Sequence, residues 1–591
     1  MKKNLSAKVL IIGAGPTGMT ASLALSKLGI SNIIIEKRDK LSPHPKAHEL
    51  SSRSLEILDW IGVKFNELKK EASDFETATK ILFCNTFHEE IGRIDLTQTG
   101  TIDKYKEHVS FPEPFLNISQ VEIERILRKH LVSAKNVQFL EKFELNSFQQ
   151  KESSVLTSIT RSNDSEMFQV QSDYVICSDG ATSKSRSLLG IKMIGPEKLS
   201  DFANIYFKND LTKIIPTKAK LYWMLNPEIP GVFIAHKPEK RWVYHIPVQT
   251  PYEKIEDFTK EVFIDRVKKA LGDNDIEIDF GSISSWRMTA QIADRFRIGS
   301  IFLSGDSCHR FPPTGGLGMN SGIADAHNLA WKLAFVINKL ASEKLLETYE
   351  TERRPVVEKN CAESLKNSVD ITEVPKSFGL NPDLGKYPPM IINSFPMKFF
   401  PVSWKKKLND FLINKVKNIS KSNRENPTKQ KMIQDTIANQ LDHFDRIGLD
   451  LGFCYRSSAI LSSEPIEKTI TSIYNANTDP GKRFPHFWID SQKKVSSFSL
   501  LSKDKFTLID FSKSKFIPKL EFKKIIEHSS LFSFKKDKSY LLEKLQITET
   551  GFLLIRPDGI IAHRKKFISK LENITKEVED SLRKILSISS L

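Results

Sequence analysis

The chain has 591 residues, which is too long for one hydrophobic core and indicates several domains. Hydrophobic residues make up 40% of it and charged residues 27%, and these ordinary fractions exclude a fibrous repeat and a disordered polar chain. The net charge of +16 comes from basic residues that are interleaved with acidic ones, without an arginine-rich arm or a DNA-binding motif, so we expect no nucleic-acid partner.

The sequence has no feature typical of membrane insertion or secretion. No uncharged apolar run approaches the roughly 18–20 residues that cross a bilayer, and the apolar stretch 9–12 is too short for a signal peptide. The five cysteines are far apart and lack the spacing of a metal site or a redox pair. We therefore expect a cytoplasmic protein with reduced thiols, no membrane span and no metal.

Residues 9–36 have the pattern of a strand, a glycine turn, a helix and a second strand. Gly13 permits the tight turn, Gly15 lets the backbone approach a pyrophosphate, and Gly18 lets the helix pack closely on the strand. The helix N-terminus would offer free N–H groups to phosphates. Glu36, at the end of the second strand, would accept hydrogen bonds from a ribose. This unit predicts dinucleotide binding without specifying the dinucleotide.

Two later segments, 174–191 and 300–333, each predict a strand that ends in an acidic turn. The first strand ends before Asp179 and the second before Asp306, and a glycine-rich loop after Asp306 leads into a long helix. A carboxylate at a strand end is an acceptor that suits a polyol.

The glycine turn, the Asp-Gly segment and the Gly-Asp segment, in this order and spacing, resemble the FAD-dependent aromatic hydroxylases, the single-component flavoprotein monooxygenases typified by para-hydroxybenzoate hydroxylase and phenol hydroxylase. The resemblance covers residues 8–365 and is densest from Trp286 to Pro355. It implies an α/β fold in which a Rossmann-like FAD-binding domain carries an inserted β-sheet substrate domain and is followed by a thioredoxin-like α/β domain. The implied units are the FAD-binding domain at 1–190, with substrate-domain segments near 75–118, the β-rich substrate domain at 191–282, the second part of the FAD-binding domain at 283–366, a helical connector at 367–440 and the thioredoxin-like C-terminal domain at 441–591.

The resemblance further implies that the three segments hold one FAD. Asp306 would bind the ribityl hydroxyls, and glycines in the following loop would let backbone N–H groups lie against the flavin ring. The implied FAD-binding residues are Gly13, Gly15, Pro16, Gly18, Glu36, Lys46, Arg53, Gln120, Asp179, Gly305, Asp306, Pro313, Gly315, Gly316, Leu317, Gly318, Met319 and Asn320. The family usually has an arginine where this chain has Lys46, and because lysine cannot reproduce a bidentate guanidinium contact, Arg53 is included as a second source of that charge.

The electron donor and the substrate are also implied by the resemblance. NAD(P)H would visit transiently, as the family's lack of a pyridine-nucleotide domain implies, and the chain has no second GxGxxG fingerprint. The residues near NAD(P)H would be Asp179, Gly180 and Arg186. The β-rich stretch alternates in polarity as a sheet with one face on a pocket does. Its candidate substrate-lining residues are Tyr222, Met224, Phe233, Tyr244 and Trp286, and ordinary sheet core is the alternative for each. No catalytic residue is identified.

The implied function is an NAD(P)H- and FAD-dependent monooxygenase that uses O2, through a flavin C4a-hydroperoxide, to hydroxylate a phenolic or other electron-rich small aromatic substrate. The alternatives are an epoxidase or a halogenase on the same fold, and a non-catalytic flavin-binding regulatory protein. The run 242–247 is similar to a halogenase motif but has Tyr244 in place of its second tryptophan. Because the C-terminal third has no CxxC motif, we expect it to have a structural or dimerisation role rather than a redox role. A homodimer is therefore one expected state of the protein.

Overall fold

The computed structural model describes residues 3–248, 253–378, 425–462, 467–490, 495–511, 522–531, 538–568 and 574–588, together with single residues or short groups between 407 and 423 and at 465 and 492. Much of the connector expected at 367–440 lies outside the described residues.

The N-terminal sheet has eight strands and a parallel centre. Its main path is β18 (Arg297–Ile298), β19 (Ile301–Leu303), β10 (Met167–Cys177), β1 (Lys3–Ile12), β2 (Asn32–Glu36) and β7 (Val137–Glu141). Off this path, β9 (Val155–Arg161) pairs with β10, and β8 (Phe143–Gln150) pairs with β9. Its central strands read as continuous apolar runs because helices bury them. The helices of this unit are α1 (Pro16–Lys27), α2 (Ser52–Ile61), α3 (Phe65–Glu71), α6 (Gln120–Ser133), α7 (Lys184–Leu188), α9 (Gly318–Ile337) and α10 (Lys344–Asp370).

A second sheet of seven strands lies beside the first and combines segments that are distant in sequence. Its order is β16 (Phe280–Met288), β12 (Ser200–Phe207), β15 (Arg241–Val248), β14 (Gly231–Lys237), β13 (Leu221–Met224), β4 (Lys80–Thr86) and β5 (Glu89–Asp95). One of its faces packs on α8 (Lys260–Leu271) and forms a separate apolar core. Strand β16 continues past residue 282, the predicted end of this unit.

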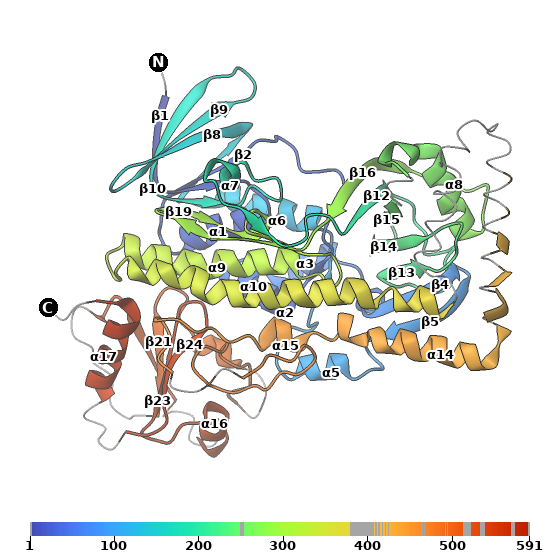
Figure 1. Ribbon diagram of the computed structural model, residues 1–591. Helices are drawn as coiled ribbons and strands as arrows, with labels where there is room; N and C mark the ends of the chain where they lie inside the picture. The colour runs from blue at the N-terminus through green and yellow to red at the C-terminus, as the bar shows by residue number, and fades with distance from the viewer. Residues whose placement is uncertain are drawn as a thin grey trace.

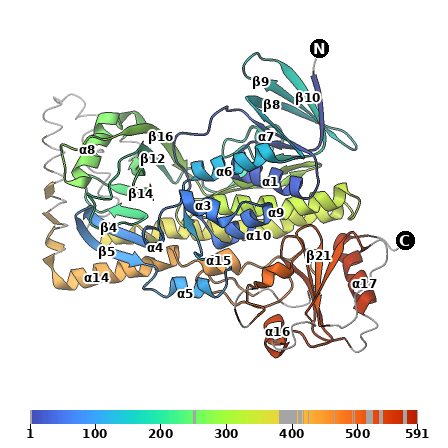
Figure 2. The same cartoon turned by 180° about the vertical axis from the view of Figure 1, so that it is seen from behind.

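The C-terminal sheet has four strands in the order β22 (Ile526–Ser530), β21 (Phe506–Asp510), β23 (Phe552–Ile555) and β24 (Ile561–Lys565), with α16 (Lys538–Leu545) and α17 (Ile574–Leu586). It packs against α9 and α10, as Figures 1 and 2 both show. Trp331 and Phe335 of α9 share an apolar core with Phe506 of β21 and Val578 of α17. The C-terminal unit is therefore joined to the N-terminal one by a buried apolar interface.

The remaining elements are short. They are α4 (Phe75–Thr79), α5 (Thr101–Lys106), α11 (Glu373–Ser377), α14 (Pro427–Ala438), α15 (Ile447–Leu451), the 3₁₀ turns Ile255–Asp257, Gly305–Ser307, Asn439–His443 and Ser497–Leu500, the small sheet β11 (Met193–Ile194), β17 (Gln291–Ala293) and β20 (His309–Arg310), and the pair β3 (Glu49–Leu50) and β6 (Leu116–Asn117). Within the described parts of the chain, every helix is too short or too polar to cross a bilayer.

Candidate functional site

A cavity of about 2050 Å³ lies between the carboxyl ends of the N-terminal strands and one face of the seven-stranded sheet. It is larger than the roughly 300–1,000 Å³ of a pocket for one small ligand, so it has room for a cofactor and a substrate. The residues predicted from sequence that line it are Gly13, Gly15, Pro16, Glu36, Lys46, Gln120, Asp179, Gly180, Asp306, Pro313, Gly315, Gly316, Leu317, Gly318, Met319, Met224 and Trp286. The structure thus brings the three predicted segments to one place.

The glycine turn between β1 and α1 is tightly packed on one side and open on the other. Gly13 has a φ of +98°, and a Cβ there would lie 2.5 Å from the carbonyl oxygen of Ser178. A Cβ on Gly18 would lie 2.0 Å from the carbonyl oxygen of Gly13. A Cβ on Gly15 would meet no atom within 4 Å, and Gly15 faces the cavity. Gly13 and Gly18 are therefore required by packing, whereas Gly15 leaves space for a ligand.

Glu36 stands at the end of β2 on the cavity wall. Its carboxylate accepts hydrogen bonds from the backbone N–H of Ala14, at 3.0 Å, and from the backbone N–H of Arg38, at 3.1 Å. These bonds tie the acidic residue to the glycine turn, so a ligand on the turn would also meet the carboxylate.

Asp306 follows β19, and its carboxylate opens to the cavity without a hydrogen bond to any described residue. Desolvation by the surrounding protein raises the pKa of this carboxyl. The Asp306 side chain is exposed to the cavity, so its oxygens are free to accept hydrogen bonds from hydroxyl groups of a ligand. The glycine-rich loop follows, with Gly315 and Gly316 at φ of +104° and +61°, and it delivers the N-terminus of α9 to the same cavity.

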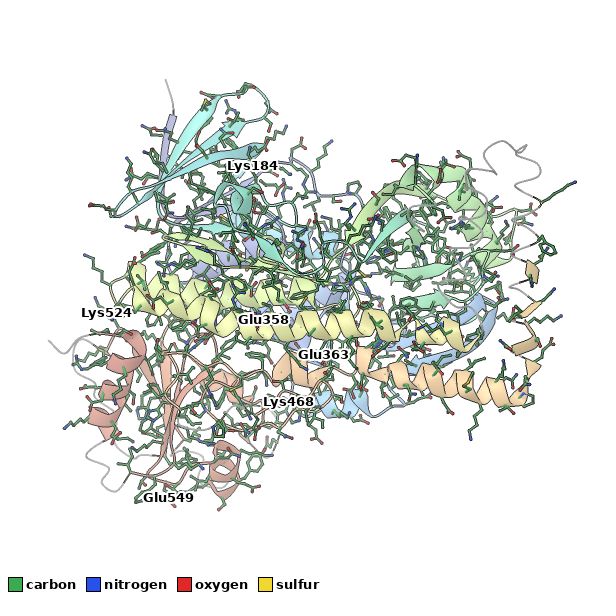
Figure 3. All side chains as sticks on the ribbon, viewed as in Figure 1. Lys184, Glu358, Glu363, Lys468, Lys524 and Glu549 are labelled. Atoms are coloured by element: carbon green, nitrogen blue, oxygen red, sulfur yellow. The ribbon has the colours of Figure 1, made fainter. Side chains whose placement is uncertain are left out.

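Lys46 and Gln120 both line the cavity, and Gln120 is held by hydrogen bonds whereas Lys46 is exposed. Gln120 donates from Nε2 to Glu124, at 2.7 Å, and accepts at Oε1 from the backbone N–H of Ala47, at 3.4 Å. Lys46 is exposed and contributes a positive charge near Asp306. Lys184 of α7, labelled in Figure 3, also lines the cavity and pairs with Glu144, at 3.5 Å.

The structure does not bring Arg53 or Arg186 to the cavity lining. The Arg53 guanidinium donates to Glu56, at 3.0 Å, and to the carbonyl oxygen of Asp558, at 2.7 Å, so it joins α2 to the C-terminal unit. Arg186 donates to the carbonyl oxygen of Ser307, at 3.0 Å. Both arginines are engaged by protein partners, and Arg186 links the two acidic turns to each other.

Gly305, Gly18 and Asn320 lie behind the cavity lining. Gly305 has a φ of +62°, and a Cβ there would lie 2.6 Å from the Thr17 hydroxyl. The Asn320 amide accepts from the backbone N–H of Ser51 and donates to the carbonyl oxygen of Glu49, both at 3.0 Å. Asn320 therefore holds the start of α9 to the segment before α2.

Three of the five candidate substrate-lining residues lie on the wrong face of the seven-stranded sheet. Tyr222, Phe233 and Tyr244 are fully buried against α8, with the rings of Phe233 and Tyr244 stacked at a centroid distance of 4.0 Å. The Tyr244 hydroxyl donates to the carbonyl oxygen of Pro230, at 2.9 Å. The prediction that these three line the pocket is wrong because alternation shows which residues share a face but not which face meets the ligand.

Trp286, which was predicted from sequence, lies on the cavity face of this sheet among polar and aromatic side chains that were not predicted. Phe202 and Asn204 of β12, His245 of β15 and Trp286 of β16 lie side by side there, and Trp223 of β13 continues the face. Phe202 and Trp286 stack at a centroid distance of 4.6 Å. His245 and Trp223 each stand one residue from a predicted residue of the same strand, so the alternation read in the opposite phase would have found them, whereas no residue of β12 was predicted.

A buried ion cluster forms the floor of the cavity and was also missed. Glu49 of β3 accepts from Lys220 Nζ, at 2.6 Å, and from Arg446, whose guanidinium also binds the carbonyl oxygen of Gly315. Burial lowers the pKa of the Lys220 ammonium to about 7, while the Glu49 carboxylate favours its charged form. No local pattern marks these residues, because the partners lie 171 and 397 positions apart in the chain.

Comparisons with known proteins agree with this geometry. A family model described as an FAD binding domain matches residues 6–364, and a model described as the C-terminal domain of aromatic-ring hydroxylases matches residues 477–587. A 2,4-dichlorophenol 6-monooxygenase from Cupriavidus pinatubonensis is 27% identical over 86% of this chain and 83% of its own length. The aklavinone 12-hydroxylase RdmE from Streptomyces purpurascens is 30% identical over 60% of this chain and 67% of its own length.

The fold is shared with solved structures over the whole chain. The flavin-dependent monooxygenase PieE, solved in complex with FAD and substrate, superposes with a TM-score of 0.83 at 24% identity and covers 99% of this chain and 100% of that one. With the matched family model covering more than half of the chain, the assignment follows: the chain belongs to the FAD binding domain family, among its aromatic-ring hydroxylases, and is a flavoprotein monooxygenase.

Proposed function

We propose that this flavoprotein hydroxylates a phenolic or other electron-rich aromatic compound, with NAD(P)H as a transient electron donor and O2 as the oxygen source. The observation that supports this most directly is the continuity of the cavity. It runs from the glycine turn and Asp306 to an aromatic and polar chamber under the seven-stranded sheet. When bound, FAD would take up electrons from NAD(P)H and activate O2 for transfer of one oxygen atom to a ring.

The residues on the cavity wall suit FAD. The open side of Gly15 leaves room for a pyrophosphate, the Glu36 carboxylate lies beside the turn, and the unpartnered Asp306 carboxylate would accept hydrogen bonds from ribityl hydroxyls. The N-terminus of α9 would place its positive end near the flavin and favour negative charge there. Asp179 and Gly180 lie on the wall where NAD(P)H is proposed to approach.

The roles of the three units are proposed on the same basis. The N-terminal sheet would hold FAD, the seven-stranded sheet would cover the substrate, and the C-terminal sheet, which we propose is thioredoxin-like, would serve structure or homodimer formation. Cytoplasmic location, which was expected from cysteine usage, stays a prediction.

The test begins with the absorbance spectrum of the purified protein and its content of FAD. We expect an aromatic compound to accelerate NAD(P)H oxidation and O2 uptake and to yield a product that is one oxygen atom heavier. Asp306→Asn should weaken FAD binding about 10- to 100-fold, because a hydrogen-bond acceptor loses its charge. Asp103→Asn is the control, because Asp103 is exposed, pairs with Lys106 and lies outside the cavity lining.

Two results would contradict the proposal. A colourless protein that does not take up added FAD would remove the cofactor assignment. A protein with full FAD content whose NAD(P)H consumption is unaffected by a broad aromatic panel would instead favour the flavin-binding regulatory alternative.

A further inference from the structure

A hydrogen-bond network of uncharged side chains crosses three strands on the cavity face of the seven-stranded sheet. The Trp286 indole N–H donates to Asn204 Oδ1, at 2.9 Å, and to His245 Nδ1, at 3.2 Å. The Asn204 amide donates in turn to the Ser284 hydroxyl, at 2.9 Å. Asn204 stands opposite both His245 and Ser284 in the two strand ladders, so the backbone register itself aligns these groups.

This network fixes which nitrogen of His245 carries the ring proton. An indole nitrogen can only donate, so Nδ1 of His245 must present its lone pair to Trp286. Burial lowers the pKa of His245 to about 3, and the imidazole is neutral at physiological pH. A neutral imidazole has one donor and one acceptor nitrogen, and therefore the proton lies on Nε2.

Nε2 of His245 is an unused donor. The ring lines the cavity, and Nε2 has no hydrogen-bond partner among the described residues. The cavity thus contains an N–H group of fixed position whose hydrogen bond is left for a ligand.

Some other polar groups near this face already have partners. Lys220 is bound to the Glu49 carboxylate on the cavity floor. His44 has Nδ1 at 3.0 Å from the Ser282 hydroxyl and Nε2 at 3.5 Å from the Asn204 amide nitrogen, so both of its ring nitrogens have partners. His48 donates from Nδ1 to Asn117, at 2.9 Å, because the Asn117 amide nitrogen is used elsewhere, and its Nε2 is therefore an acceptor. Three further N–H groups of lining residues, Trp223 Nε1, Arg266 Nη1 and Arg310 Nε, have no hydrogen-bond partner among the described residues but are themselves buried.

We propose that His245 binds the oxygen substituent of the aromatic substrate through its Nε2–H, and that Trp286 and Asn204 are positioning residues that fix this tautomer. The assignment rests on the proposed function and narrows the substrate to aromatics that carry a hydroxyl or phenolate oxygen. An analogue without that oxygen leaves the N–H group unpaired in an enclosed site and is rejected for that reason.

The test is a binding measurement on the oxidised holoenzyme. Phenol and 1-naphthol, each beside its oxygen-free counterpart benzene or naphthalene, are titrated while the flavin absorbance is followed. The wild type should bind the oxygen-bearing member of a pair more tightly. His245→Phe should reduce this preference about tenfold or more, which is the usual effect of losing one such hydrogen bond.

Two further substitutions distinguish the position of the donor from the mere presence of a polar residue. His245→Gln places an amide nitrogen near the position of Nε2 and should keep most of the preference. His245→Asn is shorter, cannot reach that position and should lose the preference as His245→Phe does. Trp286→Phe removes the indole N–H, so the ring proton of His245 can lie on either nitrogen. This variant should have a preference for the oxygen-bearing compound between those of the wild type and His245→Phe, with unchanged FAD content.

Tyr244→Phe is the matched control, because Tyr244 precedes His245 on β15 but points to the opposite face, where its hydroxyl binds Pro230. It should leave the preference unchanged. If His245→Phe and the wild type show the same preference, the role of His245 is refuted while the proposed function stands. If no aromatic compound perturbs the flavin of the wild type or accelerates NAD(P)H oxidation, the proposed function fails and this inference fails with it.

Discussion

Gly15 and Gly18 lie one helical turn apart at the start of α1, and they have opposite surroundings. An added methyl group on Gly18 would overlap the backbone of Gly13, whereas one on Gly15 would point into open space in the cavity. Gly18 thus supports folding through close packing, and Gly15 supports ligand binding through the space that it leaves.

We expect Gly18→Ala to destabilise the apoprotein by about 1–3 kcal/mol, since the backbone oxygen it meets cannot move aside cheaply. Gly15→Ala should change the apoprotein by less than about 0.5 kcal/mol but weaken FAD binding. Urea unfolding of the apoproteins and FAD titration separate the two effects. Equal losses of stability in both variants would contradict this difference in packing.

Individual residues were predictable from sequence where their reason is local. Gly13 and Glu36 belong to one short strand, turn and strand unit, so their positions on the cavity wall could be inferred from spacing. Arg53 and Arg186 could not be placed in this way. The partner of Arg53 is 505 positions away and that of Arg186 is 121 positions away, and a cation gives no local sign of which distant carbonyl it will meet.

At the scale of secondary-structure elements, one carboxylate holds three segments together. Glu49 on β3 binds Lys220, which directly precedes β13, and Arg446, which directly precedes α15. Arg446 also holds the loop that precedes α9 through the carbonyl oxygen of Gly315. The cavity floor therefore depends on an ion cluster rather than on apolar packing alone.

Glu49→Gln should cost about 3–5 kcal/mol of unfolding free energy, because two buried cations lose their common counter-ion. Lys220→Met should cost much less, since it leaves the Glu49 and Arg446 pair intact and fills a similar volume. Denaturant unfolding of the two holoenzymes compares these costs. A larger loss in Lys220→Met than in Glu49→Gln would show that the lysine, and not the carboxylate, organises the cluster.

The seven-stranded sheet shows how far an element can be predicted. The strands around Tyr222, Phe233 and Tyr244 form where the alternation indicated them. The face of the sheet that meets the cavity was predicted wrongly, because both faces carry aromatic residues, one against α8 and the other against the cavity. Only the position of the sheet between α8 and the N-terminal unit decides which face is which, and that position is a property of the whole fold.

At the scale of the whole molecule, the C-terminal unit is anchored by buried charges as well as by apolar contacts. Glu352 of α10 accepts from Arg556, at 2.7 and 3.0 Å, from Lys332 of α9, at 2.9 Å, and from the Ser457 hydroxyl, at 2.7 Å. Burial alone would raise the pKa of the Glu352 carboxyl, but Arg556 and Lys332 outweigh it and hold that pKa well below its ordinary value of 4.5.

We predict that Glu352→Gln lowers the free energy of unfolding by about 3–5 kcal/mol at neutral pH and lets a protease release the C-terminal unit faster. The folded-state pKa is depressed, so the stabilisation by Glu352 is fully present above pH 4.5 and is lost as the pH falls toward the folded-state value. Urea unfolding from pH 7 to pH 3 should show the difference from wild type becoming smaller.

Asp370→Asn is the control for this prediction, because the pair of Asp370 with Lys366 on the same helix is largely exposed and should contribute less than about 1 kcal/mol. Glu358 and Glu363, labelled in Figure 3, lie on the same helix between these two sites. A wild-type difference that grows as the pH falls would refute the assigned role of Glu352.

The order of the units along the chain could be proposed from sequence, because the glycine turn and the β-rich stretch each have their own pattern, and the bounds given for the units stay a prediction. The interface between α9, α10 and the C-terminal sheet could not be predicted. Nothing in the local sequence of Trp331 and Glu352 indicates that they bind Asp558 and Arg556.

Helix α9 contacts the cavity with its first turn and the C-terminal unit with Trp331 and Lys332 further along. Each residue of a helix advances the chain by about 1.5 Å and rotates it by about 100°. Inserting one residue between Met319 and Trp331 would therefore turn every later side chain away from its partner while the glycine loop stayed in place. The length of this helix fixes the rotation about its axis between the cavity contacts at its start and the contacts with the C-terminal unit further along. Sequence changes that keep both sets of contacts must therefore preserve the number of residues between them.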